Sequence, residues 1–152
     1  MLKIGTKAPE FNLPNQNGEM ISLKDFNGKK LVIYFYPKDN TPGCTKEALS
    51  FKEDYEKYLE NGYEVIGISK DSVSTHKKFS DKYELPFMLL SDESLETLVN
   101  YEVWAEKKMC GKRYMGILRQ TYVINEDGII INTYEKVKPE TSSSDIICSL
   151  KN

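Results

Sequence analysis

A strand that runs directly into a helix constrains the fold of this chain more than any other feature of its sequence. Residues 31–36 are all apolar or aromatic, and Pro37 ends the run. A short run rich in β-branched and aromatic residues indicates a strand that is buried on both faces of a sheet. After a loop with Pro and Gly, residues spaced by three and four form the apolar face of an expected helix: Ala48, Phe51, Tyr55, Tyr58 and Leu59. We therefore expect a strand–loop–helix unit at the centre of the fold.

Strands and helices alternate after this unit. Residues 64–69 and 87–90 are predicted to be buried strands. Between them, Asp71 or Ser72 is expected to cap a helix that extends to Tyr83, and a short helix is expected after the third strand. Strands that alternate with helices in this order favour parallel pairing, with the helices on the faces of the sheet.

Two hairpins and a closing helix complete the predicted fold. Short alternating runs around an Asn-Gly pair predict an N-terminal β-hairpin, and runs at 117–124 and 128–134 around an Asp-Gly pair predict a second one. Apolar spacing at 146–150 predicts a closing amphipathic helix. Residues 102–116 show no clean period, so an irregular stretch is expected there. The sequence shows no repeat and no linker, which predicts one domain over 1–152.

Composition and charge argue against several functional classes. The chain has 152 residues, of which 39% are hydrophobic and 29% are charged, an ordinary balance for a globular domain. Its formal net charge is −2, so we expect it to bind neither nucleic acid nor an anionic membrane. The first residues lack the apolar core of a signal peptide, and no run approaches the roughly 18–20 apolar residues that span a bilayer. A cytoplasmic location is therefore expected.

The three cysteines are widely spaced and odd in number, so they form no disulfide framework. Cys44 differs from the other two because it lies in the first turn of the expected helix. Thr41 is expected to cap this helix and Pro42 to open it, which puts Cys44 at the third helical position. Backbone N–H groups and the helix dipole favour an anion there, so the position favours the thiolate, which is the nucleophilic form of cysteine.

The residues around Cys44 resemble the active-site motif of the peroxiredoxins. Pro37, Thr41 and Cys44 have the spacing Pro-x-x-x-Thr-x-x-Cys, directly after a strand. Residues 35–48 are similar to the bacterioferritin-comigratory-protein subgroup, also called Q-type, and later matches such as 103–104 extend the resemblance over nearly the whole chain. The resemblance implies a thioredoxin-like α/β fold with a central mixed sheet, flanking helices and an N-terminal β-hairpin.

The resemblance also implies a reaction, the reduction of hydrogen peroxide and organic hydroperoxides. Cys44 would be the peroxidatic cysteine, whose thiolate attacks a peroxide oxygen and becomes a sulfenic acid. Thr41 would accept the peroxide proton, and Pro37 would shield the thiolate from bulk water. The backbone N–H groups of Cys44 and Gly43 would hold the other oxygen, and Gly43 is expected to keep the backbone open to solvent.

Arg119 is the fourth expected member of this site, although it is distant in sequence. It lies within the strand-like run 117–124, where an unpaired buried charge would be costly. Its planar fork suits a thiolate and a departing oxygen anion together, and the family carries a strand-borne arginine. Glu47, one turn beyond Cys44, is expected to orient Arg119. Two simpler interpretations stay open: an edge-strand arginine that points to water, and a solvated glutamate favoured by the helix dipole.

The sequence leaves open how the sulfenic acid is reduced. Many members of the subgroup carry a second cysteine five residues after the first, where this chain has Leu49. Cys110, in the expected irregular stretch, is a candidate resolving cysteine. Cys148, among apolar neighbours, is expected to fill the core. If neither resolves the sulfenic acid, the protein is a one-cysteine enzyme that thioredoxin or another external thiol reduces.

Other kinds of site find less support in the sequence. The single histidine, His76, is expected to pack in the interior, and the cysteine spacing matches no zinc site. No Gly-rich phosphate loop is present, so neither cofactor nor metal is expected. The alternative function is a non-enzymatic thioredoxin-fold module for redox sensing or binding, which would not need Arg119. The resemblance favours a monomer, with a dimer as the alternative.

Overall fold

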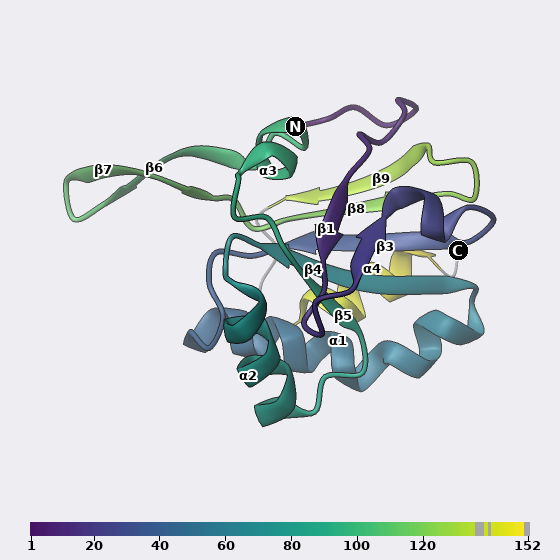
Figure 1. Ribbon diagram of the computed structural model, residues 1–152. Helices are drawn as coiled ribbons and strands as arrows, with labels where there is room; N and C mark the ends of the chain where they lie inside the picture. Colours follow the sequence, from purple (N-terminus) through teal and green to yellow (C-terminus); the bar gives the residue numbers. More distant parts are fainter. Residues whose placement is uncertain (136–138, 140, 151–152) are drawn as a thin grey trace.

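The computed structural model describes residues 1–135, 139 and 141–150, and these form a central sheet with helices packed against it (Figure 1). The last two residues of the predicted domain, 151 and 152, lie outside the described residues. The strands are β1 (Asn12–Pro14), β2 (Met20–Ser22), β3 (Lys30–Phe35), β4 (Tyr63–Ser69), β5 (Met88–Ser91), β6 (Trp104–Met109), β7 (Lys112–Ile117), β8 (Gln120–Ile124) and β9 (Ile130–Glu135). The helices are the 3-10 helix η1 (Leu23–Phe26), α1 (Pro42–Glu60), α2 (Val73–Tyr83), α3 (Glu96–Asn100) and α4 (Ser142–Leu150).

The central sheet is mixed and has the strand order β5-β4-β3-β8-β9. β3 pairs in parallel with β4, and β4 with β5, whereas β8 is antiparallel to both β3 and β9. The predicted parallel unit, the second hairpin and the N-terminal hairpin β1–β2 are thus confirmed. β3 lies in the middle because its side chains are apolar on both faces, and all of them from Leu31 to Phe35 are buried.

Alternate residues of β3 pack into two separate hydrophobic clusters. Val32 and Tyr34 face the side that α1, α2 and α4 cover, where the Tyr34 ring stacks on Phe51 with centroids 4.5 Å apart. Leu31 and Ile33 face the other side, where η1, α3 and the N-terminal segment cover the sheet (Figure 1). The prediction of helices on both faces is therefore confirmed.

Helix α1 begins and ends close to the predicted residues. Pro42 is its first residue, and Asn61 follows its last turn. One predicted inward residue is wrong: Leu59 is 47% exposed. Its neighbour Tyr58 is fully buried, and adjacent residues on a helix point about 100° apart, so only one of the two can face the sheet. Within the part of the chain that the structure describes, no helix is both long and apolar enough to cross a bilayer.

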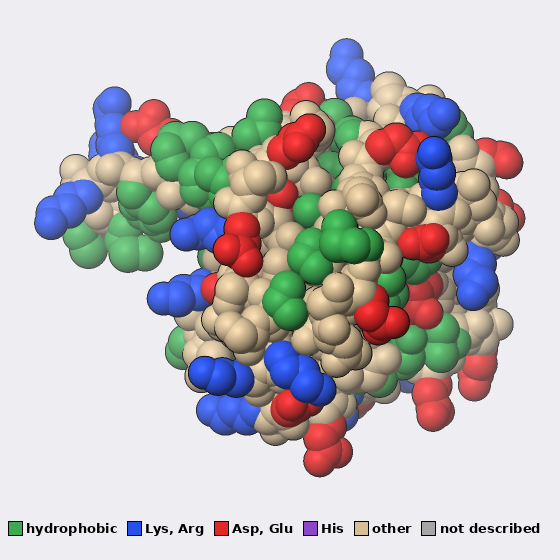
Figure 2. All heavy atoms as spheres, viewed as in Figure 1, with side chains coloured by type: hydrophobic (Ala, Val, Ile, Leu, Met, Phe, Trp, Pro, Cys, Tyr) green, Lys and Arg blue, Asp and Glu red, His purple; other side chains and the backbone are tan. Residues whose placement is uncertain are grey.

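The stretch 102–116 is not irregular, which corrects the sequence-based prediction. β6 and β7 pair in an antiparallel hairpin that projects from the body of the molecule (Figure 1). Its two-residue turn, Cys110 and Gly111, has φ values of 51° and 78°, as in a type I′ turn. Cysteine is unusual in such a turn, and the strands are largely exposed, so no alternating burial pattern marks them. Figure 2 shows apolar side chains along this hairpin and Lys and Arg side chains toward its outer end; the exposed apolar ones are Met109, Tyr114 and Met115.

Candidate active site

Helix α1 carries Cys44 at its third position, as predicted, and the side chain is 1% exposed. Thr41 stands at the N-cap, but its side chain makes no capping hydrogen bond. Instead, Thr41 Oγ1 donates to the carbonyl oxygen of Lys38 at 3.0 Å, across the loop that leads into the helix. The capping role predicted for the Thr41 hydroxyl is therefore wrong. The contact holds the hydroxyl hydrogen on the loop and leaves lone pairs of the oxygen free to accept.

Arg119 lies between Cys44 and Glu47. Its Nη2 donates to Cys44 Sγ at 3.3 Å, and its Nη1 donates to Glu47 Oε1 at 2.8 Å. The Glu47 side chain is fully buried and that of Arg119 is 20% exposed, so neither of the simpler solvent-facing interpretations holds. Arg119 is not inside a continuous strand, because β7 ends at Ile117 and β8 begins at Gln120. This short break directs the guanidinium toward the helix.

Burial and neighbouring charges have opposite effects on the pKa values of Glu47 and Arg119. Burial raises the pKa of Glu47, and the positive charge of Arg119 offsets only part of this effect. For Arg119, burial lowers the pKa, but the charges of Glu47 and Cys44 outweigh burial and raise it. The guanidinium therefore stays charged beside the sulfur, and it is held by a carboxyl group that is buried away from solvent.

Gly43 lies beside the guanidinium of Arg119. A Cβ at this position would lie 3.2 Å from Arg119 Nη2 and 3.7 Å from Pro139 Cγ, so the missing side chain of Gly43 makes room for Arg119. Gly43 is half-buried, and the expectation that it keeps the backbone open to solvent stays a prediction. Pro37 is half-buried in the loop that follows β3. The first turn of α1 and the distant Arg119 thus meet at one thiol, an arrangement suited to activating a nucleophile.

Comparison with known proteins assigns this arrangement to a family. The model of the AhpC/TSA family matches residues 4–133. The chain belongs to this family. It is similar to the peroxiredoxin Bcp of Bacillus subtilis, with 43% identity over 150 residues that cover 99% of this chain and 96% of the relative. A Bcp peroxiredoxin of Coxiella burnetii is 47% identical over 146 residues, which cover 96% of this chain and 97% of the relative.

Solved structures of peroxiredoxin Q proteins share the fold of this AhpC/TSA member. A cysteine-to-serine variant of Xylella fastidiosa PrxQ superposes with a TM-score of 0.93 at 30% identity, covering 99% of this chain and 96% of that one. The bacterioferritin comigratory protein of Xanthomonas campestris gives 0.88 at 35% identity, with 93% and 90% covered. The resemblance, the thioredoxin-like fold and the enzyme class, a thiol-dependent peroxidase, are therefore confirmed. The roles of the individual residues stay predictions.

The other two cysteines of this peroxiredoxin are both exposed. Cys148 lies on the outer side of α4, which corrects the prediction that it fills the core; Ile146 and Ile147 occupy the buried side. Cys110 lies at the end of the projecting hairpin. Lys107, in β6 of that hairpin, donates to the Ile117 carbonyl oxygen at 2.7 Å. Burial lowers the pKa of Lys107, and the nearby positive charge of Arg119 lowers it further, so this part of the hairpin lies close to the active site.

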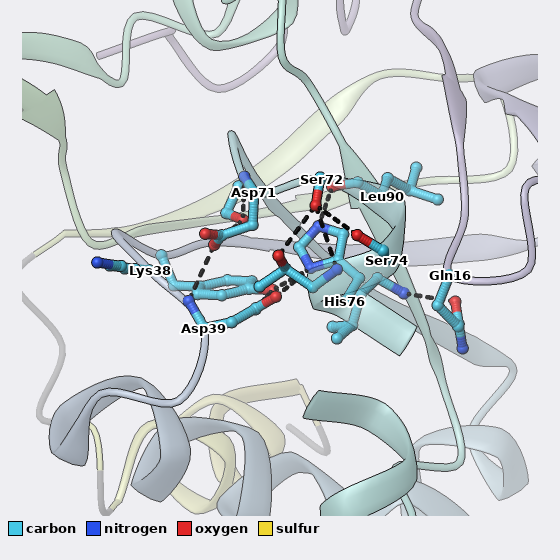
Figure 3. A network of polar contacts seen from close by, with 12 residues as sticks. Gln16, Lys38, Asp39, Asp71, Ser72, Ser74, His76 and Leu90 are labelled. Atoms are coloured by element: carbon cyan, nitrogen blue, oxygen red, sulfur yellow. Dashed lines mark hydrogen bonds and ion pairs between the residues drawn. The ribbon is translucent and has the colours of Figure 1, made fainter. Parts of the chain in front are cut away.

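A polar cluster beside the site was missed at the sequence level. Asp39, Asp71 and His76 place possible metal-ligand atoms within 4.8 Å of one another (Figure 3). Both ring nitrogens of His76 are engaged, however: Nδ1 lies 2.6 Å from Asp39 Oδ2, and Nε2 lies 3.0 Å from the carbonyl oxygen of Leu90. A cation would have to displace the proton between His76 and Asp39, so the donor set fits a hydrogen-bonded pair better than a metal site. The predicted burial of His76 is confirmed.

The raised pKa of Glu47 predicts a pH-dependent stability. A carboxyl group with a raised pKa binds more protons in the folded state, so the free energy of unfolding falls as pH rises from the ordinary carboxyl range through the raised value. We expect the parent protein to lose stability relative to Glu47→Gln across this window, by at most about 1.4 kcal/mol per pH unit. Urea denaturation at a series of pH values measures the difference. For Glu53→Gln, at an exposed position on α1, the free energy of unfolding should change with pH as it does for the parent. The same pH dependence for Glu47→Gln and the parent would contradict the prediction.

Proposed function

We propose that Cys44 is the peroxidatic cysteine and that it reduces hydrogen peroxide and organic hydroperoxides. The Cys44 thiolate attacks one peroxide oxygen, an S–O bond forms as the O–O bond breaks, and the electron pair leaves with the second oxygen. That oxygen takes up a proton and departs as water or an alcohol, and Cys44 is left as a sulfenic acid. Sulfur supplies both electrons, so this step needs no cofactor.

The position of Arg119 carries this proposal. A guanidinium 3.3 Å from Cys44 Sγ stabilises the thiolate before attack, and its planar fork reaches toward the oxygen that gains charge as the O–O bond breaks. Glu47 holds the guanidinium from behind, so the charge is already in place when the reaction begins. The alternative of a non-enzymatic sensing or binding module gives no reason for this costly buried pair.

Thr41, Pro37 and Gly43 are assigned supporting roles. Thr41 Oγ1 gives its hydrogen to the Lys38 carbonyl, so its oxygen is set to accept a hydrogen from the peroxide. Pro37 offers no N–H and covers the site from the loop side. The first-turn N–H groups of Gly43 and Cys44 lie at a helix start and can donate to the second peroxide oxygen.

The substrate class follows from chemistry and from a relative. The attacked bond is the O–O bond, so the group on the far oxygen can be hydrogen or an organic chain. The solved Xanthomonas campestris protein is described through its alkyl peroxide reduction activity, which supports organic hydroperoxides as substrates here. The buried thiol, 1% exposed, favours reagents as small as a peroxide over bulky electrophiles.

We propose that an external thiol, thioredoxin or a similar reductant, restores Cys44. This route is supported by the exposure of Cys110 in the turn of the projecting hairpin β6–β7, whereas Cys44 is buried at the start of α1 (Figure 1). The reductant thiol attacks the sulfenic sulfur, water leaves, and a second thiol completes the exchange. We further propose a cytoplasmic, monomeric enzyme whose domain comprises residues 1–152.

Peptide mapping after a single turnover tests this function. We expect one equivalent of peroxide, added without thiol, to leave a sulfenic acid on Cys44 that a dimedone-type probe labels. Probe incorporation on another cysteine instead, or none at all when Cys44 also forms no disulfide, would contradict the assignment of Cys44. A Cys44–Cys110 peptide under non-reducing conditions would instead establish internal resolution and overturn the external route.

A further inference from the structure

The loop between β3 and α1 is tied to the body of the protein through one residue, Asp39. Tyr36 donates its hydroxyl to Asp39 Oδ1 at 2.6 Å, and His76 Nδ1 lies 2.6 Å from Asp39 Oδ2. The Asp39 backbone N–H donates to Asp71 Oδ2 at 2.9 Å. Figure 3 shows Asp39 reaching from the loop to His76 on α2, with Asp71 on the other side. One carboxylate oxygen and the amide of Asp39 are therefore held by partners outside the loop, and the other oxygen is held by Tyr36 at the start of the loop.

The contacts of His76 fix the orientation of its ring. The Leu90 carbonyl oxygen can only accept, so His76 Nε2, at 3.0 Å, donates a hydrogen to it. His76 Nδ1 lies 2.6 Å from Asp39 Oδ2, so a hydrogen lies between these two atoms. The hydroxyl of Tyr36 does not supply this hydrogen, because it already donates to the other Asp39 oxygen. His76 and Asp39 are thus a hydrogen-bonded pair whose side chains are both fully buried.

The loop that this pair holds is conformationally demanding and leads straight to the nucleophile. Asn40, directly after Asp39, has φ of 58°, in the left-handed region that non-glycine residues rarely occupy. Such a conformation persists where its surroundings enforce it. Thr41 and the first turn of α1 with Cys44 come next. A change at Asp39 is therefore passed on through Asn40 to Thr41 and Cys44.

We propose that His76 is a positioning residue of the peroxidase site. Its ring, hydrogen-bonded to the Leu90 carbonyl on one side and to the Asp39 side chain on the other, holds the loop of residues 36–41 so that Thr41 and Cys44 meet the peroxide in the reactive geometry. The proposal rests on the proposed function, and it extends the site to α2.

The same pair sets the balance between the two halves of the reaction cycle. Cys44 is 1% exposed, so a thiol reductant reaches the sulfenic sulfur only when the first turn of α1 moves outward. Reaction with peroxide needs the loop in place, and reaction with the reductant needs it displaced. The His76–Asp39 pair favours the first state, and its loss shifts the population toward the second.

The test compares the two half-reactions in the parent and in His76→Gln. Glutamine keeps a donor but lacks the two opposed ring nitrogens with which His76 bridges Asp39 and Leu90. We expect the rate constant for peroxide to fall roughly tenfold, and the rate constant for re-reduction by dithiothreitol to stay constant or to rise. Stopped-flow measurement of each step gives the ratio of the rate constant for peroxide to the rate constant for re-reduction. An unchanged ratio, or an equal fall in both constants, would overturn the proposal.

Three controls separate positioning from loss of stability. Tyr83→Leu removes packing from the far end of the same helix, where the Tyr83 ring contacts Phe79, so it should lower the melting temperature and leave the ratio unchanged. Asp39→Asn should shift the ratio as His76→Gln does, and the double variant should be no worse than either single one. Additive effects in the double variant would show that the two residues do not act as a pair. Failure of the proposed function is distinguishable, because the parent itself would then not turn over.

A spectroscopic signature tests the hydrogen bond directly. In proton NMR of the folded protein at neutral pH, the hydrogen between His76 Nδ1 and Asp39 Oδ2 should give a downfield signal that is protected from exchange with solvent, and Asp39→Asn should remove this signal. Absence of the signal in the parent would contradict the buried hydrogen bond and with it the proposal.

Discussion

Replacing Cys44 with serine is expected to abolish thiol-dependent peroxide reduction while leaving the fold intact. Serine keeps the size of the side chain, but its hydroxyl does not ionise near neutral pH and is a poor nucleophile toward peroxide oxygen. The rate should fall by roughly 10⁴-fold or more, the scale of losing an enzymatic nucleophile. Consumption of hydrogen peroxide in the presence of dithiothreitol measures it.

The matched control is the same substitution at an exposed cysteine. Cys148→Ser, on the outer side of α4, should retain the parent rate. Peroxide consumption by Cys44→Ser at a rate near that of the parent would show that another group carries the chemistry.

Replacing Arg119 with methionine is expected to reduce both activity and stability. Loss of the charge beside the sulfur and the departing oxygen should lower the rate of the peroxide step by roughly 10²–10³-fold. The substitution also leaves the buried Glu47 carboxylate unpaired, which should cost about 3 kcal/mol in the free energy of unfolding. Stopped-flow kinetics and urea denaturation measure the two effects.

A double variant separates the two effects of Arg119. Arg119→Met combined with Glu47→Gln removes the orphaned charge, so much of the stability should return while the activity stays low. Arg113→Met, on the exposed hairpin, makes the same chemical change away from the site and should alter neither property. Recovery of activity in the double variant would mean that Arg119 serves only to neutralise Glu47.

The strand and helix order could be read from the sequence because its signals are local. The apolar run of β3, the three-and-four spacing on α1 and the Asp-Gly hairpin turn each depend on neighbours within a few residues. The position of Cys44 at the third residue of α1 follows from the same local rules. The hairpin β6–β7 was missed because its turn has Cys110 where Asn or Asp is usual, and because its strands bury little.

Faces and contacts were harder to predict than elements. Leu59 and Cys148 both have apolar neighbours in sequence, yet both are exposed. In each helix, a neighbouring residue occupies the position that faces the sheet. The Thr41 hydroxyl donates to the Lys38 carbonyl oxygen in the loop and does not accept from a helix N–H. The preference of threonine for N-cap positions does not predict this contact. Such choices depend on small differences in geometry that only the packed chain defines.

The sequence by itself determined the candidate nucleophile, the strand that leads to it and the family, since these depend on residues within one short stretch and on overall similarity. The tertiary structure decided what surrounds the sulfur. Arg119 is 72 residues from Glu47, and His76 is 37 residues from Asp39. Charges so far apart in sequence meet only when the sheet and helices pack, and burial then makes each pair strong and costly to break.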